Sequence, residues 1–243
     1  MSEEIHVYPT PAELVSAAAE MMIGAIAEAV AARGHAMIAL SGGTTPRGLY
    51  QALAEEPYRT RVPWDCVHLF WGDERMVPPE HAQSNFRMAK ETLVDHVPIP
   101  AENVHRVRGE APPEEAATKY AEALVGVFAG QPPRFDVVLL GLGTDGHTAS
   151  LFPGADALGE TKAPVATVFM PSLDGWRVTL TFPVLNAARR IIFLVSGVEK
   201  AAIVARVITS ESPAKRLPAT LVRPENGHVH WMLDAQAASL IQA

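Results

Sequence analysis

Helix-like and strand-like segments alternate along this whole chain, and that alternation is what most constrains its fold. Short apolar runs typical of buried strands lie at residues 36–40, 67–71, 135–140, 165–169, 178–182, 191–195 and 229–233. Apolar residues at helical spacing predict helices at residues 11–33, 46–55, 84–94, 113–129 and 198–208. Strands that alternate with helices are typical of α/β proteins with parallel sheets. We therefore expect one α/β domain over residues 1–243, in which helices flank both faces of a mostly parallel, Rossmann-like sheet.

Composition and charge restrict the partners of the chain. Acidic residues outnumber basic ones by 27 to 20, and the formal charge of −7 has the wrong sign for a protein that binds a nucleic-acid backbone. We therefore expect no nucleic-acid partner. An anionic small molecule would need a site where cations and backbone N–H groups gather locally against this negative charge.

Cysteine content and the first residues predict a cytoplasmic protein. The single cysteine, Cys66, cannot form an intramolecular disulfide, and its apolar surroundings favour a core position over a nucleophile. The acidic start Met1-Ser-Glu-Glu-Ile lacks the basic and apolar regions of a signal peptide. No run approaches the roughly 20 uninterrupted apolar residues that cross a bilayer, so we expect no membrane partner.

A glycine-rich loop, Ser41-Gly-Gly-Thr-Thr-Pro46, lies between a predicted strand and a predicted helix. Two glycines let the backbone curl around an anion, and the next helix directs its first N–H groups at that anion. The loop is not a nucleotide-binding P-loop, because Leu49 stands where that motif needs lysine. The motif alone predicts a phosphate cradle no more strongly than an ordinary turn capped by Thr45.

A second polar segment, Gly72-Asp-Glu-Arg75, directly follows a predicted strand, and Gln83-Ser84-Asn85 then precedes a predicted helix. Arg75 could fork onto a phosphate or an oxyanion, with the neighbouring acids orienting it. A polar run after a strand is often just a solvated loop. Because ligands of open α/β sheets bind beyond the carboxyl ends of the strands, the position of this segment favours a role in a site.

The third segment runs from Gly141 to Ser150 and contains a literal G-x-G-x-x-G. A dinucleotide site is disfavoured because Pro153-Gly154 ends any helix that the motif could open, and we expect no cofactor. What remains is His147 on a glycine turn beyond a strand, beside Asp145. Imidazole titrates near neutral pH, so His147 is either a general base or a structural histidine.

Two weaker signals argue against other chemistry. His228 and His230 lie two residues apart, on one face of a predicted strand, but no third ligand is visible, so we expect no metal site. Ser150 lacks the G-x-S-x-G turn that exposes a nucleophilic serine, which disfavours an acyl-enzyme.

Taken together, these segments resemble the 6-phosphogluconolactonase family, and the resemblance covers nearly the whole chain. The matching segments are 41–46, 71–78, 84–85, 141–153, 177–186 and 196–201. Glucosamine-6-phosphate deaminases of the same superfamily usually continue Asp-Gly-His with Ile-Ala-Phe-Asn-Glu-Pro, whereas this chain continues with Thr-Ala-Ser-Leu-Phe-Pro. The lactonase branch is therefore the better match.

The resemblance implies hydrolysis of 6-phospho-D-glucono-1,5-lactone to 6-phospho-D-gluconate in the oxidative pentose phosphate pathway. It implies a catalytic group of His147 as the base, Arg75 and Asp145. It also implies a substrate- and phosphate-binding set, namely Gly42, Gly43, Thr44, Thr45, Asn85, Gly146, Arg177 and Lys200. Three cations and a helix N-terminus could hold a phosphate dianion inside an acidic protein.

Two other functions stay open from the sequence. The same scaffold could deaminate or isomerise an amino-sugar phosphate, which ammonia release would reveal. A non-catalytic sugar-phosphate sensor would be expected to carry a DNA-binding helix-turn-helix or a basic tail, and the sequence pattern shows neither. We expect a monomer or a weak homodimer.

Overall fold

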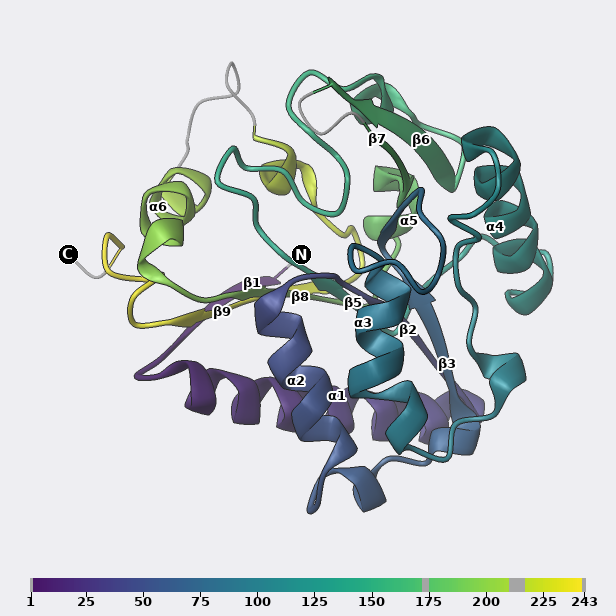
Figure 1. Cartoon of the computed structure of the whole chain (residues 1–243). Coiled ribbons are helices and arrows are strands. Elements are labelled where there is room, and N and C mark those ends of the chain that lie inside the picture. Colours follow the sequence, from purple (N-terminus) through teal and green to yellow (C-terminus); the bar gives the residue numbers. More distant parts are fainter. Residues whose placement is uncertain (1, 172–174, 210–216, 242–243) are drawn as a thin grey trace.

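A six-stranded parallel sheet forms the centre of the computed structural model, which describes residues 2–171, 175–209 and 217–241 (Figure 1). The strand order is β1-β9-β8-β5-β2-β3, and every pairing in it is parallel. The strands are β1 (Ser2–Tyr8), β2 (Ala36–Leu40), β3 (Val67–Trp71), β5 (Val137–Leu140), β8 (Arg190–Val195) and β9 (His228–Asp234). The predicted parallel α/β fold is therefore confirmed.

Helices cover both faces of this sheet and bury a separate apolar cluster on each (Figure 1). One face carries α1 (Pro11–Arg33), α2 (Thr44–Ala54) and α3 (Asn85–Thr92). The other carries α4 (Pro113–Val127), α5 (Phe182–Leu185) and α6 (Ala201–Thr209). Neighbouring residues of β9 divide between the two clusters, Trp231 on the α6 side and Met232 on the α1 side, because side chains alternate along a strand.

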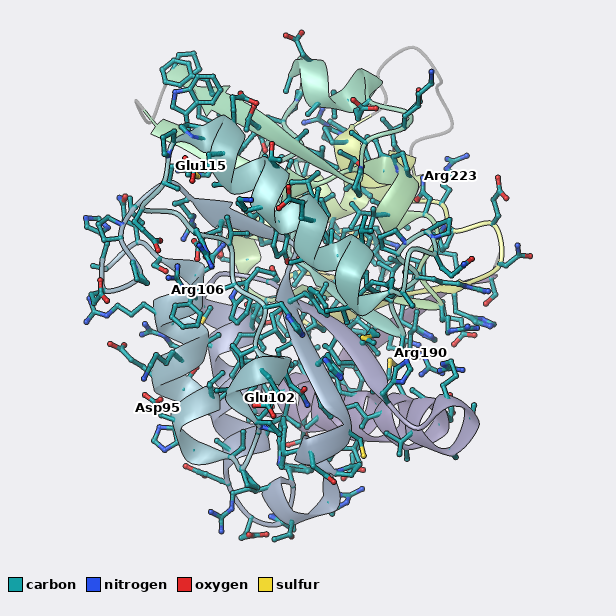
Figure 2. All side chains as sticks on the ribbon, turned by 90° about the vertical axis from the view of Figure 1, so that its right-hand side faces the viewer. Asp95, Glu102, Arg106, Glu115, Arg190 and Arg223 are labelled. Atoms are coloured by element: carbon teal, nitrogen blue, oxygen red, sulfur yellow. The ribbon has the colours of Figure 1, made fainter. Side chains whose placement is uncertain are left out.

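A second, three-stranded antiparallel sheet lies above the main one, with α4 packed against it (Figures 1 and 2). It is formed by β4 (Asp73–Arg75), β7 (Gly175–Leu180) and β6 (Val165–Met170), in that order. The predicted strands at 165–169 and 178–182 thus belong to this sheet and not to the parallel one. The second prediction was also displaced, because β7 begins three residues earlier and ends two residues earlier than predicted. Thr181 is the N-cap of α5, which has a proline at its second position, and proline favours a helix start.

Helix α1 has the boundaries that its capping box predicts. The Thr10 hydroxyl accepts a hydrogen bond from the Glu13 amide at 3.2 Å, and the Glu13 carboxylate accepts one from the Thr10 amide at 3.1 Å. Gly34 ends the helix in the left-handed conformation at φ +79°. By length and composition α1 could cross a membrane, but 44% of its most apolar window is buried in the fold, as in a core helix.

Strand β1 was not predicted, because its sequence Ser-Glu-Glu-Ile-His-Val-Tyr carries few apolar residues. It lies at the edge of the sheet, where β9 is its one partner among the described strands, and its apolar residues Ile5 and Val7 are exposed. A strand of this kind is held mainly by its hydrogen bonds to one neighbour, so hydrophobic patterning does not reveal it.

Candidate active site

A cavity of about 360 Å³ opens beyond the carboxyl ends of β2, β5 and β8. The structure brings nine of the predicted site residues to its wall. These are Gly42, Gly43, Thr44, Thr45, Arg75, Asn85, His147, Arg177 and Lys200. Asp145 and Gly146 do not line the cavity, but they form the turn that holds His147.

The glycine-rich loop leads directly into α2, which begins at Thr44, two residues earlier than predicted. Gly43 is the N-cap at φ +109°, and no side chain caps this helix within the described residues, so the alternative of a cap by Thr45 is wrong. Tyr50 anchors the start of the loop, since its hydroxyl accepts from the Ser41 amide and donates to the Ser41 carbonyl. The first N–H groups of α2 are therefore available to an anion in the cavity.

Gly42 makes room for Asn85. A Cβ on Gly42 would lie 2.0 Å from Asn85 Oδ1, which no real contact permits. Asn85 is buried at the start of α3, and its side-chain amide donates to the Asp73 carbonyl at 2.9 Å. The two predicted segments around residues 42 and 85 are thus packed against each other.

Arg75 lies beside Arg177, because β4 and β7 pair these two residues directly. The Arg75 guanidinium donates to Asn85 Oδ1 and to the Gln83 carbonyl, both at 2.7 Å. Burial, followed by the charge of Arg75, lowers the pKa of Arg177. The positive charges of two adjacent guanidinium groups repel each other, so binding of an anion between them would be favourable.

Glu74 holds the start of α3, and with it Asn85, in position. Its buried carboxylate accepts from the amides of Asn85 and Phe86, at 2.8 and 2.7 Å, and from the Ser84 hydroxyl. Burial raises the pKa of Glu74, and the backbone hydrogen bonds oppose that rise. A carboxylate at the N-terminus of α3 both caps the helix and fixes the position of Asn85.

Sequence reasoning missed Asp73 and the place of Ser150 in the site. Both line the cavity, and the Ser150 hydroxyl donates to the Asp73 carboxylate at 2.7 Å. The available signal was the position of Asp73 at the head of the Asp-Glu-Arg segment. The Ser150 hydroxyl is engaged with the Asp73 carboxylate and has no histidine partner among the described residues. That Ser150 is not a nucleophile stays a prediction.

His147 is held by a tight glycine turn. Its Nδ1 lies 2.6 Å from Asp145 Oδ1, which also accepts from the His147 amide at 3.1 Å. Gly146, at φ +86°, and a hydrogen bond from the Gly143 amide to the His147 carbonyl complete the turn. With Nδ1–H donating to the carboxylate, Nε2 keeps its lone pair, and none of the described residues bonds to it.

The carboxylate of Asp145 stays ionised beside this imidazole. Burial opposes its ionisation, but the hydrogen bonds from the His147 amide and ring outweigh burial and lower the pKa of Asp145. Phe152 packs on the other side of the His147 ring, with ring centroids 4.3 Å apart. An ionised acid that fixes the tautomer and orientation of a histidine is the arrangement that general-base catalysis needs.

Lys200 brings a third cation to the wall of the cavity. It lies in the short helix Val198–Lys200 before α6, and its Nζ donates to the Leu142 carbonyl at 2.9 Å. Among the described residues, neither Lys200 nor Arg75 forms a salt bridge, although Asp73 and Glu199 also line the cavity. Three cations and a helix N-terminus therefore surround the space in front of His147.

Comparisons with known proteins decide the family. A model of the glucosamine-6-phosphate isomerases/6-phosphogluconolactonase family matches residues 9–231. The 6-phosphogluconolactonase of Synechocystis sp. is 41% identical over 242 residues, covering 98% of both chains. The chain belongs to the 6-phosphogluconolactonase family. A family member from Mycobacterium tuberculosis is 39% identical over 247 residues, again with 98% of both chains covered.

Solved structures of the 6-phosphogluconolactonase family share the whole fold. The enzyme from Trypanosoma brucei superposes with a TM-score of 0.85 at 34% identity, covering 100% of this chain and 99% of the other. The enzyme from Thermotoga maritima gives 0.82 at 31% identity, with 96% and 100% covered. A monomeric glucosamine-6-phosphate deaminase gives 0.81 at only 22% identity, which shows a shared fold alone. The predicted family, lactonase branch and enzyme class, a lactone hydrolase, are confirmed.

Proposed function

We propose that this chain hydrolyses 6-phospho-D-glucono-1,5-lactone to 6-phospho-D-gluconate in the oxidative pentose phosphate pathway, with His147 as the general base. One observation carries the proposal. His147, which is hydrogen-bonded to Asp145, lines the same cavity as Arg75, Arg177 and Lys200. A base beside a cluster of cations suits a substrate that has both a hydrolysable carbonyl and a phosphate.

The reaction begins when water attacks C1 of the lactone while Nε2 of His147 removes a proton from that water. The negative charge that develops on the carbonyl oxygen is stabilised by a cation or a backbone N–H of the cavity wall. The tetrahedral intermediate then collapses and the ring C–O bond breaks. The leaving ring oxygen takes the proton back from His147, so the histidine is regenerated and 6-phosphogluconate leaves.

The remaining groups have proposed binding roles. The N-terminus of α2 and the cations bind the phosphate dianion, while Asn85 and Asp73 contact sugar hydroxyls. The δ-lactone is a reactive ester, so a base-activated water supplies the modest rate increase that the reaction needs. The predicted roles of Gly42, Gly43, Thr44 and Thr45 belong to the same phosphate-side loop.

A direct comparison of two reactions tests the substrate. We expect the chain to accelerate lactone hydrolysis, followed as proton release with the spontaneous rate subtracted, and to release no ammonia from glucosamine 6-phosphate. Ammonia release without lactone hydrolysis would replace the proposal with a deaminase. Failure of both reactions, with sugar phosphate still bound in calorimetry, would favour a sensor.

A further inference from the structure

Three potential metal ligands meet on β1 and β9, the two neighbouring strands at one edge of the parallel sheet, outside the cavity described above. Glu4 and His6 lie two residues apart on β1 and so share a face of the strand. His230 of β9 lies directly opposite Glu4 in the parallel register. The face they share is the one that carries Met232 and α1.

The donor atoms of these side chains form a nearly equilateral triangle. His6 Nε2 lies 3.3 Å from His230 Nδ1 and 3.4 Å from Glu4 Oε2. His230 Nδ1 lies 3.6 Å from the same Glu4 oxygen. Three atoms with lone pairs therefore converge on one point.

These separations match the ligand spacing of a tetrahedral zinc site. Ligands at about 2.0–2.2 Å from Zn²⁺ lie about 3.3–3.6 Å apart when they occupy the corners of a tetrahedron. Two imidazoles and one carboxylate form a common ligand set for this ion, with the fourth position left to water. Mg²⁺ and Ca²⁺ instead prefer a shell of oxygen ligands, which these residues do not provide.

The three ligand side chains differ in how much of their surface is exposed. The side chains of His230, His6 and Glu4 are 11%, 32% and 51% exposed, so the open side of the triangle faces solvent.

We propose that Glu4, His6 and His230 bind a divalent transition metal ion, Zn²⁺ or one of similar ligand preference, and that this ion fastens the edge strand β1 to β9. The placement gives the ion a structural role. Strand β1 has one neighbour and exposed apolar side chains, so a cross-link stabilises it where packing contributes little. The prediction of no metal site considered only His228 and His230, whereas Glu4 and His6 of β1 also lie beside His230.

The first experiment titrates Zn²⁺ into the full-length chain after removal of metal with a chelator. We expect calorimetry to show one equivalent bound at this site, and thermal unfolding to shift to higher temperature with added zinc. Co²⁺ in place of zinc should give the visible absorption of a four-coordinate site. Replacing one ligand should weaken binding, by roughly 10-fold or more for Glu4→Gln and roughly 100-fold or more for His6→Gln.

Glu3→Gln is the matched control, because it removes the same charge from the same strand on the opposite face, where Glu3 accepts from the Trp231 indole. We expect this variant to bind zinc like the wild type. The His147→Ala variant distinguishes zinc bound at the proposed site from any zinc bound by the catalytic histidine. We expect the zinc-dependent thermal shift of this variant to remain. The proposal is wrong if the wild type binds no equivalent of zinc, or if Glu4→Gln and His6→Gln titrate like Glu3→Gln.

Discussion

At the residue scale, the site depends on glycines that leave space for neighbouring side chains. A Cβ on Gly143 would lie 2.1 Å from His147 Nδ1 and 2.7 Å from Asp145 Oδ1. A Cβ on Gly146 would meet Leu217 at 2.9 Å, at a backbone conformation that other residues rarely adopt. Gly143 thus makes room for the His147–Asp145 contact, and Gly146 makes room for Leu217.

The Gly42→Ala substitution tests this packing argument on the phosphate side. The new methyl group must displace Asn85, so we expect kcat/KM to fall by roughly 10-fold or more, because small displacements of positioning groups are costly. Gly126→Ala is the control, since nothing lies within 4 Å of its Cβ on α4. Steady-state kinetics of both variants should show a loss for the first alone, and equal values would contradict the role of Gly42.

Sequence reasoning reached most of the site residues but little of their geometry. Residue types and their positions after strands pointed to His147 and Arg75, because parallel strands bring the loops that follow them to one edge. The pairing of Arg75 with Arg177 could not be foreseen, since the short strand β4 has no hydrophobic pattern of its own. The ligands on β1 were missed for the same reason.

At the element scale, one buried carboxylate joins α1, β2 and the start of β8. Asp136 accepts from the Arg33 guanidinium at 2.6 Å and from the Met37 amide at 2.9 Å, and Arg189 Nε lies 3.3 Å away. Removing this acid leaves buried donors without partners. We expect Asp136→Ala to lower the free energy of unfolding by about 3 kcal/mol.

Asp95 provides the contrast for that prediction. It pairs with Lys90 on the surface, at a position labelled in Figure 2, and exposed ion pairs contribute little. Urea unfolding of Asp95→Ala should therefore change the free energy of unfolding by less than about 1 kcal/mol. Similar losses in both variants would show that the network around Asp136 does not hold these elements together.

A stacked pair of histidines should make stability depend on pH. His68 of β3 and His105 have ring centroids 5.4 Å apart, and burial, then the charge of His68, lowers the pKa of His105 to about 4 from 6.5. Between these values the unfolded chain holds a proton that the folded chain does not. The free energy of unfolding should therefore fall as pH drops through this window, by about 1–2 kcal/mol after allowance for partial exposure.

Unfolding curves measured at several pH values check this dependence. His105→Gln should remove most of the slope between about pH 6.5 and pH 4. His96→Gln alters an exposed imidazole and should leave the slope as in the wild type. An unchanged slope in His105→Gln would assign the pH dependence to other groups.

The elements themselves were predictable where periodicity is strong. The buried strands β2, β3, β5 and β8 and the helix α1 appear close to their predicted bounds, because their apolar residues repeat at the period of the element. The pairing partners of the strands were not predictable from the sequence. The segments that form β6 and β7 have the same apolar pattern as core strands of the parallel sheet, although they pair with each other as a hairpin. Tertiary packing, with one face partly exposed at Phe169 and Trp176, separates them from the parallel sheet.

At the scale of the whole molecule, a local cluster of cations attracts an anionic substrate to a protein whose net charge is −7. Attraction of this kind is screened by salt, so we expect KM for the phosphorylated lactone to rise several-fold between about 0.05 and 0.5 M salt, while kcat changes less. Glucono-1,5-lactone, which lacks the phosphate, should show no such rise. A KM that is independent of salt would contradict binding of phosphate by these cations. A cytoplasmic location and a monomer or weak homodimer stay predictions.

The central claim is that His147 activates water for lactone hydrolysis. Proton release at about pH 6.5, where imidazole can exchange a proton, compares the wild type with His147→Ala after subtraction of the spontaneous rate. We predict a fall in kcat of about 100-fold or more in a variant whose unfolding transition is unchanged. A folded variant with nearly the wild-type kcat would contradict the account and require another base in the same cavity.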